Sequence, residues 1–132
     1  MIQQRALSKY HSPGLWTNTC CSHPRIDEEV MDNAHQRLVE EMGFDCKFEK
    51  AFSFVYRTDV GNGLTEHEFD HVFVGYFDGE PLINKKEVED WKYKDMVSLR
   101  DDIDHHPGNY TEWFKIAFEK VEDYILKNDV RN

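Results

Sequence analysis

The sequence predicts a single α/β or α+β domain, in which helices are interspersed among the strands of a mixed sheet. Its 132 residues are about the length of one domain. Apolar residues make up 39% and aromatic residues 14%, which is enough for a packed core although 32% of the chain is charged. Segments with helical spacing alternate with segments rich in β-branched and aromatic residues. We therefore expect one domain over residues 1–132.

The first part of the chain predicts a strand, a turn and a helix. Residues 1–7 have the pattern of a strand that is already under way, so we expect the chain to begin inside its domain. A turn is expected at residues 12–14. A helix is expected over residues 27–42, because Asp27 is a suitable N-cap and Val30, Ala34, Leu38 and Met42 recur every four residues. Gly43 is expected to end it.

The rest of the chain predicts three strands and two helical segments. Residues 48–57 and 66–77 read as strands, separated by a turn at 59–63 and followed by a turn at 78–79. A short strand is expected at 88–94, and one or two helical turns at 95–102. Thr111 is expected to cap a last helix whose inward residues are Trp113, Ile116, Ala117, Val121 and Tyr124.

Charge and cysteine content narrow the classes of function. A net charge of −10 disfavours binding to nucleic acids or anionic membranes. Three cysteines, two of them adjacent, argue against a disulfide framework and favour a reducing cytoplasm. No run approaches the roughly 18 apolar residues of a membrane span, and no leader pattern is present. We expect a cytoplasmic monomer or weak dimer with a small-molecule ligand.

Two pairs of residues at i and i+2 indicate proton-transfer or metal chemistry. Cys21 and His23 point the same way in an extended chain, although such a pair alone is more often a buried cysteine beside a surface histidine. Glu66 and Glu68 share one face of a strand, with His67 on the other. An isolated pair is usually solvated. The apolar residues that follow indicate a central strand, where two carboxylates need a metal or a shared proton.

The remaining charged and aromatic candidates could bind a ligand, or they could be ordinary surface and core residues. Glu40 and Glu41 end the first helix, where they are either a solvated face or ligands for Mg²⁺. Arg5, Lys9 and Arg37 could bind a phosphate, although each alone is ordinary surface charge. Trp113 and Tyr56 are aromatic residues of the kind usually found in the core. A ring that faces a site can stabilise a cation by about 2 kcal/mol.

Taken together, these residues resemble type I isopentenyl-diphosphate isomerases. The resemblance rests on RALSK at residues 5–9 and PGLWTNTCCSHP at 13–24, and it extends from residue 2 to at least Trp113. Residues 22–44 keep the spacing of a Nudix box, with Ser22 in place of its glycine and Gln36-Arg37 in place of its Arg-Glu pair. The resemblance implies a Nudix-like α/β/α sandwich. It also implies isomerisation of isopentenyl diphosphate to dimethylallyl diphosphate through a carbocation-like intermediate, in isoprenoid biosynthesis.

The resemblance also implies a role for each site residue. The catalytic residues would be Cys21, Glu68, Tyr56 and Trp113. The diphosphate contacts would be Arg5, Lys9 and Arg37. A Mg²⁺ ion associated with the diphosphate would be held by Glu41, and a second divalent metal (Mg²⁺, Mn²⁺ or Zn²⁺) by His23, Glu66 and Glu68.

One departure from the family leaves alternatives open. The family carries two further metal-ligating histidines on a segment before the position at which this chain begins. The sequence therefore suggests a fragment, a mis-started frame or a naturally short form that is incomplete at its N-terminus, with a weaker metal site and an exposed sheet edge. The alternatives are a Nudix-type pyrophosphohydrolase, which Gln36-Arg37 disfavours, and an inactive truncated isomerase that binds a diphosphate or a partner.

Overall fold

The computed structural model describes residues 1–21, 29–61 and 63–128, with the backbone alone described at residues 56, 58–61 and 64–68. The elements in chain order are β1 (Ile2–Arg5), β2 (Trp16–Thr17), α1 (Val30–Met42), β3 (Phe48–Gly61), β4 (Leu64–Gly75), β5 (Val88–Lys92), α2 (Met96–His105), a 3-10 turn (Pro107–Asn109) and α3 (Glu112–Asn128).

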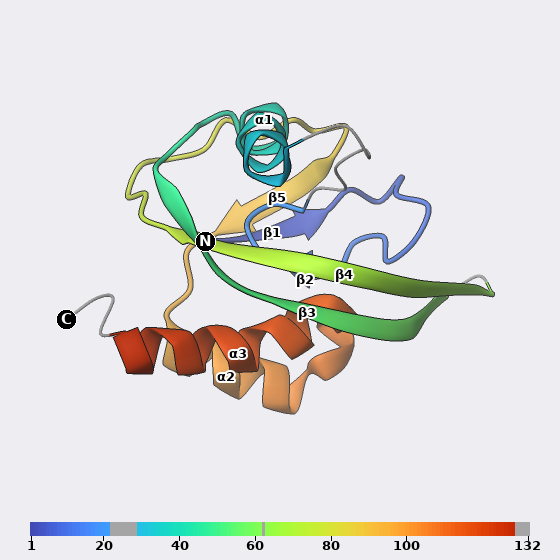
Figure 1. Ribbon diagram of the computed structural model, residues 1–132. Helices are drawn as coiled ribbons and strands as arrows, with labels where there is room; N and C mark the ends of the chain where they lie inside the picture. Colours follow the sequence, from blue (N-terminus) through green and yellow to red (C-terminus); the bar gives the residue numbers. More distant parts are fainter. Residues whose placement is uncertain (22–28, 62, 129–132) are drawn as a thin grey trace.

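The elements form layers, with α1 on one side of the strands and α2 and α3 on the other (Figure 1). One sheet has the order β2-β1-β5, and the second is the hairpin of β3 and β4. This arrangement confirms the predicted α+β class. The strand pairs in both sheets are antiparallel. A mixed sheet was expected to contain parallel pairs as well, and in the described part of the chain the parallel pairing is limited to an isolated bridge between Trp16 and Tyr110.

The N-terminal strand and the following turn are confirmed. β1 lies between β2 and β5, with Gln3 opposite both Thr17 and Trp91. The turn at residues 12–14 has positive φ at Ser12 (50°) and at Gly14 (73°). The carbonyl of Arg5 accepts a hydrogen bond from the Gly14 amide, so the turn folds back on the end of β1.

Helix α1 begins three residues later than predicted. Its N-cap is Glu29, whose backbone is extended (φ −70°, ψ 128°), whereas Asp27 lies outside the described residues. The predicted end is confirmed. Gly43 adopts φ 71°, and its amide donates to the Val39 carbonyl. A β-carbon at Gly43 would also collide with the Leu82 carbonyl, because the chain returns directly beneath the helix end.

The β3–β4 hairpin is longer and less central than predicted. Residues 59–61, expected to be a turn, continue β3, and Gly61 pairs with Leu64. β4 ends at Gly75 because the chain then turns away, and Phe77 stacks on Phe44 with ring centroids 3.7 Å apart. Among the described strands β4 pairs with β3 alone, so the prediction of a central strand is wrong.

The C-terminal helices are confirmed in position, with different inward residues in α3. α2 extends to His105, and Asp95 caps it by accepting from the Ser98 amide at 3.0 Å. Thr111 caps α3 as predicted, because its Oγ1 accepts from the Phe114 amide. Ile116, expected to face inward, is 37% exposed. Phe114 and Phe118 are buried beside Trp113, since this face of the helix packs between the hairpin and α2.

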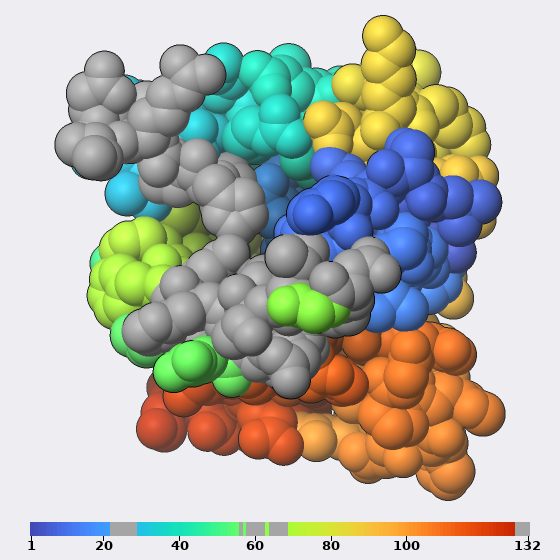
Figure 2. Space-filling view, turned by 90° about the vertical axis from the view of Figure 1, so that its right-hand side faces the viewer, coloured from blue at the N-terminus to red at the C-terminus, as the bar shows by residue number. Residues whose placement is uncertain are grey.

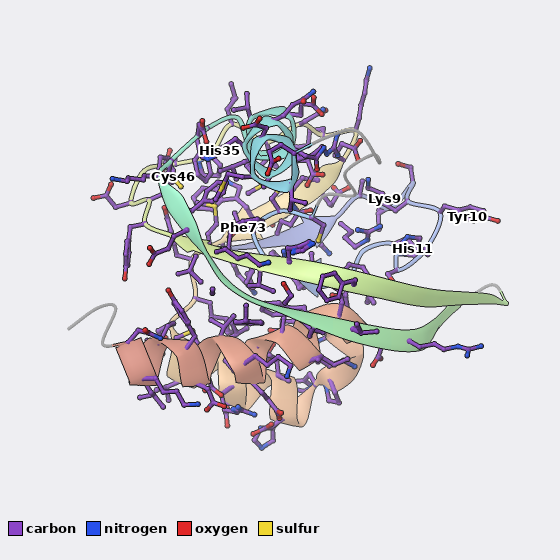
Figure 3. The ribbon with its side chains drawn as sticks, viewed as in Figure 1. Lys9, Tyr10, His11, His35, Cys46 and Phe73 are labelled. Atoms are coloured by element: carbon purple, nitrogen blue, oxygen red, sulfur yellow. The ribbon has the colours of Figure 1, made fainter. Side chains whose placement is uncertain are left out.

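Two apolar clusters fill the spaces between the layers. The larger lies above α2 and α3 and consists of Ile2, Phe54, Leu99, Ile103, Tyr110, Trp113, Phe114 and Phe118. The smaller lies beneath α1 and consists of Leu38, Met42 and Val88, with Cys46 and Phe48 packed against it. Phe73 points from β4 into the space below α1 (Figure 3). None of the described helices is long and apolar enough to cross a membrane.

Candidate active site

The adjacent cysteines lie in different environments. Cys21 packs against the cluster that contains Trp113, whereas Cys20 packs against the cluster beneath α1. The Cys20 thiol lies 3.5 Å from Oε1 of Glu41, and the Cys21 thiol lies 3.3 Å from Oδ1 of Asn18. The cavity between the layers is lined by both cysteines. Of these two cysteines, Cys21 is therefore the one that packs against the cluster containing Trp113, which the sequence predicts to be catalytic.

The environment of Cys21 keeps its thiol protonated at neutral pH. Burial raises the pKa of Cys21 to about 11, and the negative charge of Glu41 acts in the same direction, while Arg5 opposes them. Burial, followed by the charge of Glu41, raises the pKa of Cys20 far above its ordinary range. Both side chains are consequently thiols rather than thiolates, which suits a group that holds a proton.

Trp113 is anchored at the start of α3 with its ring facing the N-terminal half of the chain. The side chain is 8% exposed, and its Nε1 donates to Oδ1 of Asn18 at 3.3 Å. The guanidinium carbon of Arg5 lies 5.2 Å from the ring centroid, and the His11 ring packs edge-on at 6.0 Å. The predicted aromatic residue and the predicted thiol therefore meet through one asparagine.

Arg5 carries a buried positive charge that lacks a carboxylate partner within the described residues. Its Nη2 donates to the His11 carbonyl at 3.2 Å. Its Nε is buried without a hydrogen-bond acceptor in the part of the chain described here. Of the ion pairs between described residues, none includes Arg5, in contrast to Lys9, Arg37 and Arg100. A guanidinium in this state is suited to binding an anion from outside the protein.

Glu41 is a buried carboxylate at the end of α1. Its Oε2 pairs with Arg37, one helical turn earlier, and its Oε1 accepts from Nε2 of Gln3 at 3.0 Å. The side chain is 5% exposed and also contacts Cys20. A carboxylate has about four lone pairs, so these contacts leave room for one further ligand. The predicted magnesium ligand therefore lies beside a predicted diphosphate contact.

Lys9 and Arg37 converge on a glutamate that the sequence did not indicate. The Lys9 ammonium pairs with Glu87, and Nη2 of Arg37 lies 3.7 Å from the same carboxylate. The Lys9 hydrogen bond is the main cause that lowers the pKa of Glu87. Lys9 lies on the loop that follows β1 (Figure 3), and the N-terminal segment lies against the segment that leads into β5 (Figure 2). The two cations thus share one face.

Several predicted residues are placed only in part. His23 lies outside the described residues. The backbone register sets Tyr56 opposite Glu68, and Thr58 opposite Glu66. Over the described ranges, no group of three or more histidine, cysteine, aspartate or glutamate residues is arranged to hold a metal ion. The predicted His/Glu metal site therefore stays a prediction.

Sequence reasoning missed three residues of the site: Asn18, Gln3 and Glu87. Asn18 lies inside the motif that identifies the family resemblance, yet no pattern distinguished it from the threonines beside it. Gln3 is one of two consecutive glutamines in a strand, and only burial against Glu41 separates it from Gln4. Glu87 has no motif signal, because its partners lie 78 and 50 residues earlier in the sequence.

Comparisons with known proteins give consistent matches. Residues 1–114 match the NUDIX domain model. The chain is 55% identical over 121 residues to Isopentenyl-diphosphate Delta-isomerase 2 of Aromatoleum aromaticum, which covers 92% of this chain and 64% of that protein. It is 48% identical to Isopentenyl-diphosphate Delta-isomerase 2 of Photorhabdus laumondii, covering 94% and 73%, and 44% identical to Isopentenyl-diphosphate Delta-isomerase of Pectobacterium atrosepticum, covering 94% and 69%. The chain thus spans about two thirds of the length of these relatives.

Proposed function

Because this chain belongs to the Nudix domain family and, within it, to the isopentenyl-diphosphate Delta-isomerases, we propose that it interconverts isopentenyl diphosphate and dimethylallyl diphosphate. One proton is added to the terminal alkene carbon, another is removed from the carbon on the far side, and the double bond moves between them. The diphosphate remains intact. The product would supply isoprenoid biosynthesis.

This reaction requires particular groups around the alkene. The intermediate resembles a tertiary carbocation, which water would trap, so the pocket has to be dry. An acid and a base have to act from opposite faces of the carbon skeleton. An aromatic face stabilises the positive charge that develops between them. The diphosphate serves as an anchor whose binding energy orients the alkene.

The observation that supports the proposal most directly is the Cys21–Asn18–Trp113 arrangement. A protonated thiol and an indole ring contact the same amide oxygen, and Arg5 lies over the ring. We propose that Cys21 holds the transferred proton on Sγ and that Trp113 faces the cationic intermediate. Glu68 is proposed as the opposing carboxylate, assisted by Tyr56, which is its register partner across the hairpin.

The anchor would be the cluster of three cations. Arg5 would bind the diphosphate with the donors that lack a protein acceptor in the described part of the chain. Lys9 and Arg37 would exchange their contacts with Glu87 for phosphate oxygens. A diphosphate is more highly charged than one carboxylate, so this exchange is electrostatically favourable.

Divalent metals enter the proposal at two places. Type I isomerases and Nudix domains depend on divalent metals in general. Glu41 is an oxygen donor beside Arg37, and Mg²⁺ commonly binds through one carboxylate together with substrate phosphates, so its chemistry fits. Such an ion would neutralise part of the diphosphate charge. A second ion (Mg²⁺, Mn²⁺ or Zn²⁺) is proposed at His23, Glu66 and Glu68, where it would influence the protonation of Glu68.

The setting of the protein is also a proposal. Cys20, Cys21 and Cys46 are free thiols, which favours the cytoplasm. We further propose that the protein is a monomer or a weak dimer. A small-molecule diphosphate is the proposed ligand, and the net charge of −10 argues against nucleic acids and membranes.

Proton incorporation tests the function. The chain is incubated with isopentenyl diphosphate and Mg²⁺ in D₂O, and the products are followed by NMR. We expect deuterium in a methyl group of dimethylallyl diphosphate, lost in Cys21→Ala and retained in the matched variant Cys46→Ala. Release of inorganic phosphate instead would contradict isomerisation and indicate a hydrolase. Unchanged turnover in Cys21→Ala would exclude the proposed role of the thiol.

A further inference from the structure

Asn18 lies at the centre of the site, and the proposed function gives it no role so far. Its Oδ1 lies 3.3 Å from Sγ of Cys21 and 3.3 Å from Nε1 of Trp113. Its Nδ2 donates to the Cys20 carbonyl at 2.6 Å. One amide side chain therefore contacts both of the groups between which the alkene is proposed to lie.

The partners of Asn18 determine which way its amide is oriented. An indole N–H can only donate, so Trp113 requires the amide oxygen. A backbone carbonyl can only accept, so Cys20 requires the amide nitrogen. Both requirements select the same orientation, in which Oδ1 faces Cys21. An oxygen cannot donate to a thiolate, so Cys21 has to be the donor, and its proton lies on the line from Sγ to Asn18.

Asn18 is itself connected to the start of α3. Thr17 Oγ1 lies 2.9 Å from Oδ1 of Asn18 and 2.8 Å from Oγ1 of Thr111. Both threonines are fully buried, and Thr111 caps the helix that carries Trp113. A consistent chain of donors runs from the Phe114 amide to Thr111, to Thr17 and then to Asn18. A displacement of Trp113 is therefore transmitted to the amide that orients the thiol.

We propose that Asn18 is a positioning residue that orients the Cys21 proton and the Trp113 ring relative to each other, so that both face the carbon skeleton of the substrate. This inference rests on the proposed isomerase function. Within the described part of the chain, Asn18 makes no hydrogen bond to Arg5, Lys9 or Arg37, so we expect its loss to change the chemical step and to leave the diphosphate anchor intact. A misplacement of about 1 Å at a reacting group can lower a rate about a hundredfold.

The test compares Asn18→Ala and Asn18→Asp with changes at Asn84, an exposed asparagine whose side chain caps a surface turn at the Lys86 amide. We expect Asn18→Ala to lower kcat at least thirtyfold while KM and the Kd for inorganic pyrophosphate stay within threefold. The indole N–H resonance of Trp113, assigned with Trp113→Phe, should move upfield because its acceptor is lost. Asn84→Ala should change none of these quantities.

Asn18→Asp keeps the shape of the side chain and the acceptor oxygen but adds a negative charge. Because the acceptor oxygen remains, we expect the indole N–H resonance of Trp113 to stay downfield of its position in Asn18→Ala; Asn84→Asp should leave the resonance at its wild-type position. An unmoved indole resonance in Asn18→Ala, or a kcat within twofold of wild type, would overturn the inference. If the wild-type chain gives no isomerisation, the proposed function fails, while the indole resonance in Asn18→Ala and Asn18→Asp still decides whether Asn18 positions the Trp113 ring.

Discussion

Replacing Arg5 with methionine separates substrate anchoring from stability. Methionine keeps most of the apolar stem and removes the guanidinium, which is buried over the Trp113 ring without a carboxylate partner in the described residues. If Arg5 binds the diphosphate, affinity falls. If it serves the fold, stability falls instead. The two outcomes differ enough to be distinguished with one variant.

The expected size of each effect follows from the contacts. A guanidinium makes two charge-assisted hydrogen bonds to a phosphate, each worth about 1.5–3 kcal/mol, so losing both weakens binding by at least about 3 kcal/mol, or more than about a hundredfold. For folding, the bond to the His11 carbonyl and the ring contact together contribute roughly 2–3 kcal/mol. Removing the unpartnered buried Nε returns roughly 1–3 kcal/mol. The net effect on the free energy of unfolding therefore lies between a gain of about 1 kcal/mol and a loss of about 2 kcal/mol.

Calorimetric titration with inorganic pyrophosphate and Mg²⁺ measures affinity without requiring turnover, and urea denaturation measures stability. Arg100→Met is the matched control, because the guanidinium carbon of Arg100 also lies 5.2 Å from the centroid of an aromatic ring, that of Phe118. Its replacement changes the net charge of the protein by the same amount. Arg100 is paired with Glu122 between α2 and α3. We expect its replacement to leave the pyrophosphate Kd within twofold. A wild-type Kd in Arg5→Met, or a loss of several kcal/mol of stability, would refute the assigned role of Arg5.

Three further predictions concern titration, charge and backbone. Since the pKa of Cys21 is raised to about 11, only about one part in a thousand of it is thiolate at pH 8, and its rate of alkylation should rise steadily from pH 7 through pH 11. Mass spectrometry measures this rate relative to that of Cys46, and a rate that reaches a plateau below pH 9 would contradict the buried site. Glu87→Gln removes the carboxylate that competes for two predicted diphosphate cations, so calorimetry should show pyrophosphate bound about threefold to tenfold more tightly, and weaker binding would argue that Glu87 orders them. Gly43→Ala places a β-carbon at a residue with positive φ and against the Leu82 carbonyl, so urea denaturation should show that the free energy of unfolding falls by more than about 1 kcal/mol. An unchanged free energy of unfolding would indicate that the helix end can relax.

Local patterns predicted most elements of the fold. The spacing of α1, its glycine stop and the Thr111 cap of α3 depend on contacts within about four residues, which can be read from the sequence directly. The errors arose where distant segments decide the outcome. α3 buries Phe114 and Phe118 rather than Ile116 because the hairpin and α2 cover that face. The hairpin exceeds its predicted length because cross-strand pairing continues through residues with turn propensity.

The sequence by itself determined the family and the set of candidate site residues, because a motif as specific as residues 13–24 can be recognised without coordinates. Only the tertiary structure decided how those residues act together. It turned Cys21 toward Trp113 and Cys20 toward Glu41, and it joined Asn18 to an indole 95 residues away. It also set Glu87 against Lys9 across 78 residues and left Arg5 without a carboxylate among the described residues. Hydrogen bonds and ion pairs between distant segments depend on distances that chain folding alone establishes, and no local pattern encodes them.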